Sequence, residues 1–186
     1  MTARLDDDKA LAPFVDYLQA LYGATPPDLV VALGAPAAEF PQRYRNRRFP
    51  KTPMLFTSVE VRRVQYDKLT EYDTVAAAAH NFPAASETIL QVLPDTKLIA
   101  VVNGASPNEV FWQGVFEREL APLGGRVELR WYNRLSFEDL LKDVAHLPPH
   151  SAIFWHLMSV DAAGITHEGV TALHRLSAAA NAAAYG

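Results

Sequence analysis

The chain has 186 residues, 49% of them hydrophobic, so it can bury a core as one domain or two small lobes. Its formal net charge of -4 gives no electrostatic reason to expect a nucleic acid as partner. There is no cysteine, which excludes disulfides, thiolate zinc sites and thiol catalysis. The first ten residues carry no apolar signal core, and no apolar run approaches the roughly 20 residues that a membrane crossing needs. We therefore expect the chain as given to be soluble.

Short apolar or β-branched runs alternate with longer amphipathic stretches, which is the pattern of strand-helix-strand units around a parallel sheet. The predicted fold class is therefore α/β. The first predicted elements are a helix over 10–22, a strand over 28–33, a helix over 36–47 and a strand over 54–59. A polar loop follows over 60–73. The run TVAAAA at 74–79 is ambiguous, because threonine and valine favour strands whereas alanine favours helices. We interpret it as a short strand or crossover.

The second part of the chain continues the alternation. Its predicted elements are helices over 83–93, 107–121, 137–146 and 167–180, with strands over 97–102, 126–132 and 152–157. Alanine dominates the final segment, AAANAAAYG, and the chain stops just where another strand would be expected to begin. The internal boundary is placed at the crossover near 74–82, which divides the chain into a first lobe over 1–76 and a second lobe over 77–186.

The stretch VVNGASPNE at 101–109 joins a predicted strand to a predicted helix. Ser106 is the expected N-cap, Pro107 suits the first helical position, and Glu109 completes a Ser-x-x-Glu capping box. The N–H groups at a helix start favour an acceptor, so this loop is a candidate for holding one end of a ligand. A well-capped turn without a ligand is the alternative. The loop lacks the further glycines of a dinucleotide fingerprint and no GxxxxGK[ST] occurs, so nucleotide binding is not predicted.

Small or polar residues lie at the ends of four of the predicted strands. These segments are Gly34-Ala35-Pro36, Thr57-Ser58-Val59, Asn103 to Pro107, and Met158-Ser159-Val160-Asp161. Ligands of open α/β sheets bind beyond the carboxyl ends of the strands. We therefore expect the four segments to converge on one crevice.

Trp112, Phe116 and Leu120 follow one another at i, i+4 and i+8, with Phe111 and Val115 beside them. This periodicity is typical of the buried side of a helix. We therefore interpret the stripe as core and not as a ligand-binding box.

Catalytic chemistry has weak support in the sequence. Neither a GxSxG elbow nor a Ser-x-x-Lys motif is present, and the six histidines show no metal-binding spacing, so no enzyme, metal or cofactor is predicted. His156, in IFWHLM, is either a hydrogen-bonded strand histidine or a base. The alternative function is an α/β hydrolase or transferase that uses Ser106 or Ser159 with His156. A third interpretation is a structural or interaction domain that has no ligand.

Four stretches carry a family resemblance: PPDLVVALGAPAAEF, FPKTPMLFTSV, LPDTKLIAVVNGASPNE and LPPHSAIFWHLMSVDAAG. They are similar to the periplasmic-binding-protein-like (type I) domain of ABC-transporter substrate-binding proteins. That domain also occurs as the extracytoplasmic sensor region of bacterial histidine kinases. The resemblance implies two parallel-sheet lobes that close on a small-molecule ligand without catalysis. It also implies truncation at both ends, since family members have further strands before the first helix and after the last.

The resemblance implies which residues face a cleft between the lobes: Gly34, Ala35, Pro36, Thr57, Ser58, Asn103, Ala105, Ser106, Ser159 and Asp161. A ligand carboxylate would lie at the start of the helix over 107–121, and Asp161 would suit a ligand amine. The implied location is periplasmic or extracytoplasmic, with membrane contact only through regions outside this chain. A first lobe without its preceding strands would have an exposed sheet edge, so a homodimer through that edge is a further hypothesis.

Overall fold

The computed structural model describes residues 8–186, so residues 1–7, at the start of the first expected lobe, lie outside the description. The fold is α/β, as predicted, and every pair of neighbouring strands in its two sheets is parallel. The chain divides into an N-terminal unit that ends at His80 and a C-terminal unit that begins at Asn81. No helix in the described part of the chain is both long and apolar enough to cross a bilayer.

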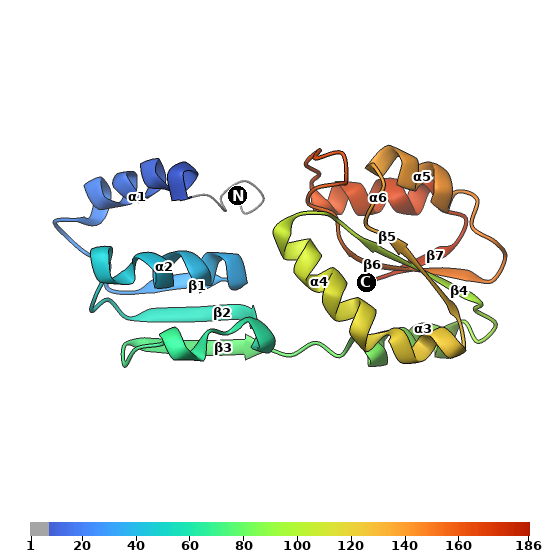
Figure 1. Cartoon of the computed structure of the whole chain (residues 1–186), viewed down its shortest axis with the longest axis horizontal. Helices are drawn as coiled ribbons and strands as arrows, with labels where there is room; N and C mark the ends of the chain where they lie inside the picture. Colours follow the sequence, from blue (N-terminus) through green and yellow to red (C-terminus); the bar gives the residue numbers. More distant parts are fainter. Residues whose placement is uncertain (1–7) are drawn as a thin grey trace. The chain divides into compact units, whose positions relative to one another are not determined.

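The N-terminal unit contains two long helices and a three-stranded sheet in the order β1-β2-β3 (Figure 1). Its elements are α1 (Asp8–Tyr22), β1 (Val30–Leu33), α2 (Ala35–Arg48), β2 (Met54–Glu60), η2 (Val61–Arg63), η3 (Tyr66–Lys68) and β3 (Asp73–Ala78). The ambiguous run at 74–79 is therefore a strand. The loop predicted over 60–73 holds two single-turn 3-10 helices, η2 and η3.

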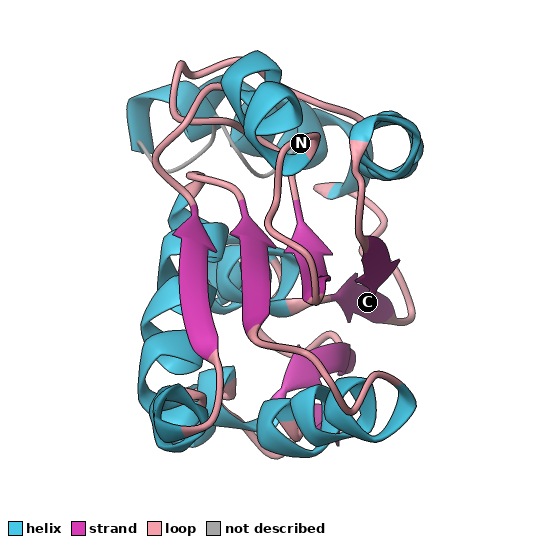
Figure 2. Ribbon diagram, turned by 90° about the vertical axis from the view of Figure 1, so that its right-hand side faces the viewer, coloured by secondary structure: helices cyan, strands magenta, loops and turns pink. Residues whose placement is uncertain are grey.

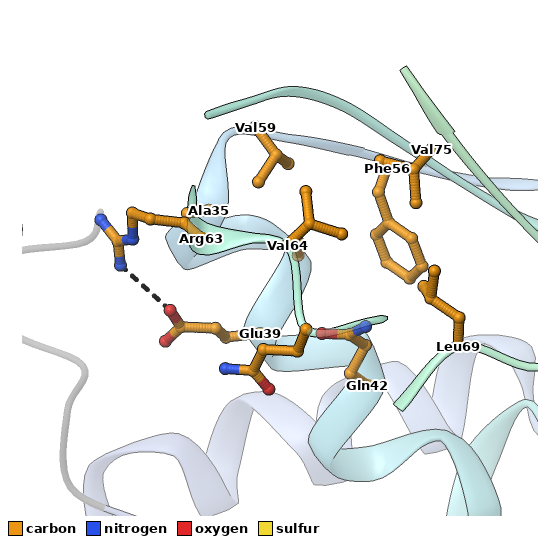
Figure 3. Close-up of a pocket in the computed structure, with 11 residues that line it drawn as sticks. Ala35, Glu39, Gln42, Phe56, Val59, Arg63, Val64, Leu69 and Val75 are labelled. Atoms are coloured by element: carbon orange, nitrogen blue, oxygen red, sulfur yellow. Dashed lines mark hydrogen bonds and ion pairs between the residues drawn. The ribbon is translucent and has the colours of Figure 1, made fainter. Parts of the chain in front are cut away.

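Helix α2 covers one face of this sheet. Met54 and Phe56 of β2 point to that face and are buried with Ala35 and Ala38 of α2. The other long helix, α1, lies on the side of α2 that is away from the sheet (Figures 1 and 3), where the Phe14 and Phe40 rings are 5.4 Å apart. The layers of this unit are thus sheet, α2 and α1.

The C-terminal unit is built around a four-stranded sheet in the order β5-β4-β6-β7. Its elements are α3 (Phe82–Val92), β4 (Leu98–Asn103), α4 (Pro107–Glu119), η4 (Ala121–Gly125), β5 (Glu128–Tyr132), α5 (Phe137–Val144), β6 (Ser151–Leu157), α6 (Gly169–Ala179) and β7 (Ala183–Tyr185). In Figure 2 the strands nearest the viewer run side by side with their arrowheads in one direction. All their carboxyl ends therefore lie at one edge of the sheet.

Strand β4 lies inside this sheet, and all six of its residues are buried. Leu98, Ala100 and Val102 pack into the core formed with α5 and α6, whereas Ile99 and Val101 pack into the core formed with α3 and α4. This is the period-2 alternation of a strand between two apolar layers. Trp112, Phe116 and Leu120 belong to the second of these cores, which confirms the interpretation of the aromatic stripe.

The alanine-rich end of the chain contains a strand that the sequence did not predict. Strand β7 pairs in parallel with β6, so tertiary pairing outweighs the low β-propensity of alanine. Asn181 turns the chain toward this position: its N–H donates to the carbonyl oxygen of Val144 at 3.2 Å, and its Nδ2 donates to that of Leu147 at 2.9 Å.

Some predicted boundaries shift by a few residues. Helix α4 ends at Glu119, before the predicted residue 121, and continues as the 3-10 turn η4, which contains Pro122 and two glycines. Proline cannot donate the next helical hydrogen bond. The following strand starts at Glu128, after the predicted residue 126, because the N–H groups of Arg126 and Val127 still bond back to the carbonyl oxygen of Leu123 in η4. Helix α6 starts at Gly169, and the side chain of the N-cap residue Glu168 accepts the N–H groups of Val170 and Thr171.

Candidate functional site

The loops that follow β4 and β6 lie side by side at the carboxyl edge of the C-terminal sheet. The N–H of Gly104 donates to the carbonyl oxygen of Leu157 at 2.8 Å, and the N–H of Ala105 donates to that of Val160 at 2.7 Å. These bonds extend the pairing of β4 with β6 beyond the strands themselves. The sequence segments 103–107 and 158–161 are therefore brought together, as expected for this unit.

Glu109 fastens the two loops to each other. Its side chain is fully buried, at 0% exposure. One carboxyl oxygen accepts the N–H of Ser106 at 2.8 Å, and the other accepts the N–H of Ser159 at 2.5 Å. The Ser106 hydroxyl in turn accepts the N–H of Glu109 at 3.4 Å, so the predicted capping box is present. One side chain thus caps α4 and holds the start of the loop after β6.

Gly104 makes room for this carboxyl group. A Cβ atom built on Gly104 would lie 2.5 Å from the carboxyl carbon and both carboxyl oxygens of Glu109. Contacts that short do not occur between real side chains, so one of the two groups would have to move. Glycine is required here for close approach and not for an unusual backbone angle.

Asp161 organises the loop after β6 and connects it to α5. Its carboxyl oxygens accept the N–H groups of Phe137, Ala163 and Ile165, each at 2.9 Å, and lie 3.0 Å from Nε2 of His167. The Phe137 N–H belongs to the first residue of α5, so the same carboxyl group satisfies a free donor at that helix start. The two buried carboxyl groups, on Glu109 and Asp161, thus tie together the loops after β4 and β6 and the start of α5.

The hydrogen bonds lower the pKa of Asp161. Burial by itself would raise it, but the N–H groups of Phe137 and Ile165 and the side chain of His167 stabilise the ionised form more strongly, so the pKa falls below its usual value of 3.8. This carboxyl group is 3% exposed and has four internal partners. The carboxyl group that was predicted to bind a ligand amine therefore already has partners within the protein, and it holds the loop after β6 in place.

The expectation that free backbone N–H groups await a ligand carboxylate at the start of α4 is wrong. The N–H of Ala105 bonds to the loop after β6, and the N–H of Ser106 bonds to Glu109. The carboxyl group of Glu109 itself occupies the position where an anionic ligand was predicted. The favourable field at the helix start is thus used by the chain's own side chain.

Asn103 and His156 lie behind these loops, on the face of the sheet covered by α3 and α4. Asn103 is fully buried, and its Nδ2 donates to the carbonyl oxygen of Glu109 at 2.7 Å. Its Oδ1 therefore faces Nδ1 of His156, 3.1 Å away, and accepts the proton that Nδ1 carries. The His156 ring also contacts the rings of Trp112 and Phe116. His156 is thus a hydrogen-bonded strand histidine, the first of the two roles considered for it.

The predicted site residues of the N-terminal unit lie just after β1 and, in the case of Thr57 and Ser58, inside β2, which continues to Glu60. Gly34, with a φ of 79°, begins α2, and its N–H donates to the carbonyl oxygen of Thr57 at 2.9 Å. Ala35, the first residue of α2, is buried against the sheet, and Pro36 lies in the first turn of the same helix. Ser58 has a φ of 54° at the point where the register of β2 against β3 shifts by one residue. Thr57 and Ser58 therefore lie beside the carboxyl end of β1, where Leu33 pairs with Thr57, and not at the carboxyl end of β2 as predicted.

A pocket in the N-terminal unit lies between α2 and the sheet, beneath the segment 61–69 (Figure 3). Phe56, Val64 and Leu69 line it, and the ion pair between Arg63 and Glu39 spans 3.0 Å at its side. Its cavity volume is about 10 Å³, which is room for about one water molecule. The pocket is therefore part of the core and not a ligand site of metabolite size.

The sequence did not indicate that Glu109 and Asp161 brace the site. Glu109 was recognised through the local spacing of its capping box, whereas its bond to Ser159 joins positions that are 50 residues apart. Asp161 was noted as a polar residue after a strand, but its donors come from its own loop and from α5. Glu109 and Asp161 share one signal in the sequence. Each is an acidic residue in a segment of small residues that follows a strand.

Within residues 8–186, no group of three or more histidine, aspartate or glutamate side chains is arranged to hold a metal ion. No family model matches the chain, and no match to a curated protein or to a solved structure was found. The candidate site therefore rests on the geometry of the loops at the strand ends.

Proposed function

We propose that this chain is a small-molecule-binding module without catalytic activity, and that a ligand binds beyond the carboxyl ends of β4 and β6. The observation that carries the proposal is the pair of hydrogen bonds from Ser106 and Ser159 to the buried carboxyl group of Glu109. Loops that are fixed in this way form a preorganised rim. A ligand that binds to such a rim does not have to order the loops first, which favours affinity.

The proposed contacts are side chains and not backbone N–H groups. Ser159 is the strongest candidate because its N–H donates to Glu109 and its carbonyl oxygen accepts the N–H of His167 at 2.9 Å. Both backbone groups are thus used within the protein, while the half-buried side chain lies at the loop surface. The small side chain of the half-buried Ala105, in the facing loop, leaves space for a ligand beside it.

In the N-terminal unit, the same rule for parallel sheets supports ligand contacts at the carboxyl end of β1 and at the part of β2 beside it. The residues proposed there are Gly34, Ala35, Pro36, Thr57 and Ser58. The hydrogen bond from Gly34 to Thr57 fixes the end of β1 against β2, as Glu109 fixes the loops after β4 and β6. These residues remain part of the proposed binding function.

The environments of the candidate nucleophiles favour binding over catalysis. The Ser106 hydroxyl is buried and serves as the N-cap of α4. His156 uses Nδ1 to bond Asn103 and packs among aromatic rings of the α3 and α4 layer. Groups with these structural duties are poor candidates for a nucleophile and its base.

The four sequence stretches described above support a more specific role. In this proposal the chain is the extracytoplasmic sensor region of a histidine kinase or the substrate-binding component of an ABC transporter. Strand β1 lies at an edge of its sheet, and this supports the proposed homodimer, since an unpaired strand edge is able to pair with another chain.

A thermal-shift screen of the whole chain with amino acids, small carboxylates, aromatic acids and sugars tests the binding proposal. We expect one of these classes to raise the unfolding temperature, and calorimetry then measures its affinity. Ser159→Ala should weaken binding by about 3- to 10-fold, the scale for one neutral hydrogen bond. Ser177→Ala, at an exposed position of α6, is the matched control and should leave the affinity unchanged.

Two results would contradict the proposal. One is the absence of any shift with all four classes at millimolar concentration. The other is turnover of an ester or phosphate substrate that disappears in His156→Ala while the fold is retained, because this would assign the site to an enzyme.

A further inference from the structure

The three-stranded sheet of the N-terminal unit has one face without a helix in the described part of the chain. Side chains alternate along each strand, so the residues next to those buried under α2 point to the opposite face. The strand register places these residues in two rows, Val31–Leu55–Thr74 and Leu33–Thr57–Ala76. We call these six residues the open face.

The open face is apolar and accessible. Val31 is 51% exposed and Leu33 is 66% exposed, and Leu29, just before β1, extends the apolar surface. None of the six residues of the open face carries a charge. Contiguous apolar surface of this kind marks a site of interaction more often than a lone exposed leucine does.

Parallel sheets are almost always covered on both faces. The C-terminal unit follows this rule, because α5 and α6 cover one face of its sheet and α3 and α4 cover the other. The N-terminal sheet has the same all-parallel pairing, but within residues 8–80 α2 and the segment 61–69 both pack on one of its faces. The open face is therefore an incomplete layer and not an ordinary solvated surface.

We propose that the open face is a docking surface for one amphipathic helix of a partner protein. The dimensions fit one helix, because three strands about 4.8 Å apart make a surface roughly 10 to 14 Å wide and a helix with its side chains is about 10 to 12 Å across. The opposite face gives a direct comparison. There a single helix of 14 residues, α2, packs on the same sheet.

A second copy of the chain fits this face less well. A stable interface between two proteins uses about 20 to 30 residues from each side. The open face offers six residues, which matches one side of a short helix with contacts at positions i, i+3, i+4 and i+7. The size of the surface thus favours a helix over a face-to-face dimer.

The chemistry of the open face also defines the partner. A charged group pressed against Val31 or Leu33 would lose its hydration and find no partner there. The contacting positions of the helix are therefore apolar, and its charged residues lie on the side that remains in water. Leucine, valine and alanine are the side chains that fill the spaces between valine, threonine and alanine on the sheet.

A fluorescently labelled synthetic peptide tests the proposal with the whole chain. The probe has 14 residues, with leucine at helical spacing i, i+3, i+4, i+7 and i+11 and with glutamate and lysine elsewhere. Its control is a peptide of the same composition in which the leucines have no helical spacing. Fluorescence anisotropy should show saturable binding of the first peptide and at least about 10-fold weaker binding of the second, because only the first presents its apolar contacts on one side.

Variants of the protein locate the binding. Leu33→Lys should weaken binding of the helical peptide by at least about 10-fold, because it places a charge against the apolar side of the helix. Val170→Lys is the matched control: this residue is 62% exposed on α6 of the C-terminal unit, and the variant should bind like the unchanged protein. Ala76→Lys, on β3 in the same row as Leu33, provides a second test if Leu33→Lys unfolds at a lower temperature.

Several results would overturn the proposal. These are equal binding of both peptides, unchanged binding to the folded Leu33→Lys and Ala76→Lys variants, or no saturable binding. Sedimentation that shows a dimer of the unchanged chain, lost in Leu33→Lys, would assign the open face to a second copy. Co-sedimentation with phosphatidylcholine and phosphatidylglycerol vesicles, lost in the same variant, would assign it to a lipid surface.

Discussion

The carboxyl group of Glu109, in the first turn of α4, accepts the backbone N–H of Ser159, 50 residues further along the chain, at 2.5 Å. The same group accepts the N–H of Ser106 from its own capping box. A side chain that ordinarily serves only the start of a helix therefore also fixes the loop after a neighbouring strand. The geometry of the candidate site depends on this long-range bond.

Replacing Glu109 by glutamine should destabilise the C-terminal unit by about 1 to 3 kcal/mol, the scale for leaving a buried group without its hydrogen bond. The new amide NH2 would face one of the two backbone N–H donors that Glu109 now satisfies. All three tryptophans lie in this unit, so urea denaturation followed by tryptophan fluorescence reports on it. Glu117→Gln, at an exposed position of the same helix, should change stability by less than about 0.5 kcal/mol. Equal effects of the two substitutions would show that the Glu109 bonds contribute little.

Gly104→Ala should cost about 1 to 3 kcal/mol, the usual scale for adding a methyl group to a packed site. The added Cβ would lie 2.5 Å from the Glu109 carboxyl group, whereas a Cβ on Gly124 would meet nothing within 4 Å. Gly124→Ala is therefore the control. Shortening Glu109 to alanine removes the clash, so the double variant Gly104→Ala, Glu109→Ala should be more stable than the sum of the single effects. Strict additivity in urea denaturation would refute the steric explanation.

Asp161→Asn should destabilise the protein at neutral pH, and the difference should shrink in acid. The folded-state pKa of Asp161 lies below the unfolded-state value of about 3.9, so its ionised form stabilises the fold above that value. This contribution is lost as the pH falls through the folded-state pKa. We expect a difference of about 1 to 3 kcal/mol at pH 7 that decreases below pH 4 or so. Urea denaturation of both proteins from pH 7 to pH 3 measures it, with Asp67→Asn as an exposed control. A difference that stays constant over this range would contradict the assignment.

Asp73→Ala should destabilise the N-terminal unit by about 3 to 5 kcal/mol, because it leaves the buried Arg45 guanidinium without its ion-pair partner. The pair links α2 to β3. Replacing both residues, as Arg45→Met with Asp73→Ala, removes the unpaired charge and should cost less than the single change. Since this unit has no tryptophan, far-ultraviolet circular dichroism must be used to follow its unfolding. A double variant that is less stable than Asp73→Ala would show that packing and not charge determines the effect.

The sequence predicted most of the fold because most elements depend on local patterns. The alternating apolar residues of β4 and the Ser106–Glu109 capping box are both short-range signals, and both are present in the structure. Strand β7 was missed because its alanines have no preference for a strand, and it forms only through pairing with β6. Local sequence preference determines secondary structure where tertiary contacts favour no alternative. At β7 the pairing with β6 determines it instead.

The sequence predicted where the loops of the candidate site lie, but not which hydrogen bonds hold them. The rule for parallel sheets located the loops after β4 and β6, and the structure brings Ala105 and Val160 together. The sequence did not show that Asp161 and Glu109 use their carboxyl groups inside the protein. Hydrogen-bond partners that are distant along the chain follow from the folded geometry, and no spacing rule encodes them.

The order of the strands has a consequence for synthesis on the ribosome. In the N-terminal unit each strand pairs with the one made just before it, so its sheet is complete when Ala78 has emerged. In the C-terminal unit the first strand made, β4, pairs with β5 on one side and with β6 on the other. The most apolar strand of this sheet must therefore leave the ribosome before either of its neighbours exists. During that interval the apolar segment LIAVVN is unpaired, so it is exposed to aggregation and to binding by chaperones.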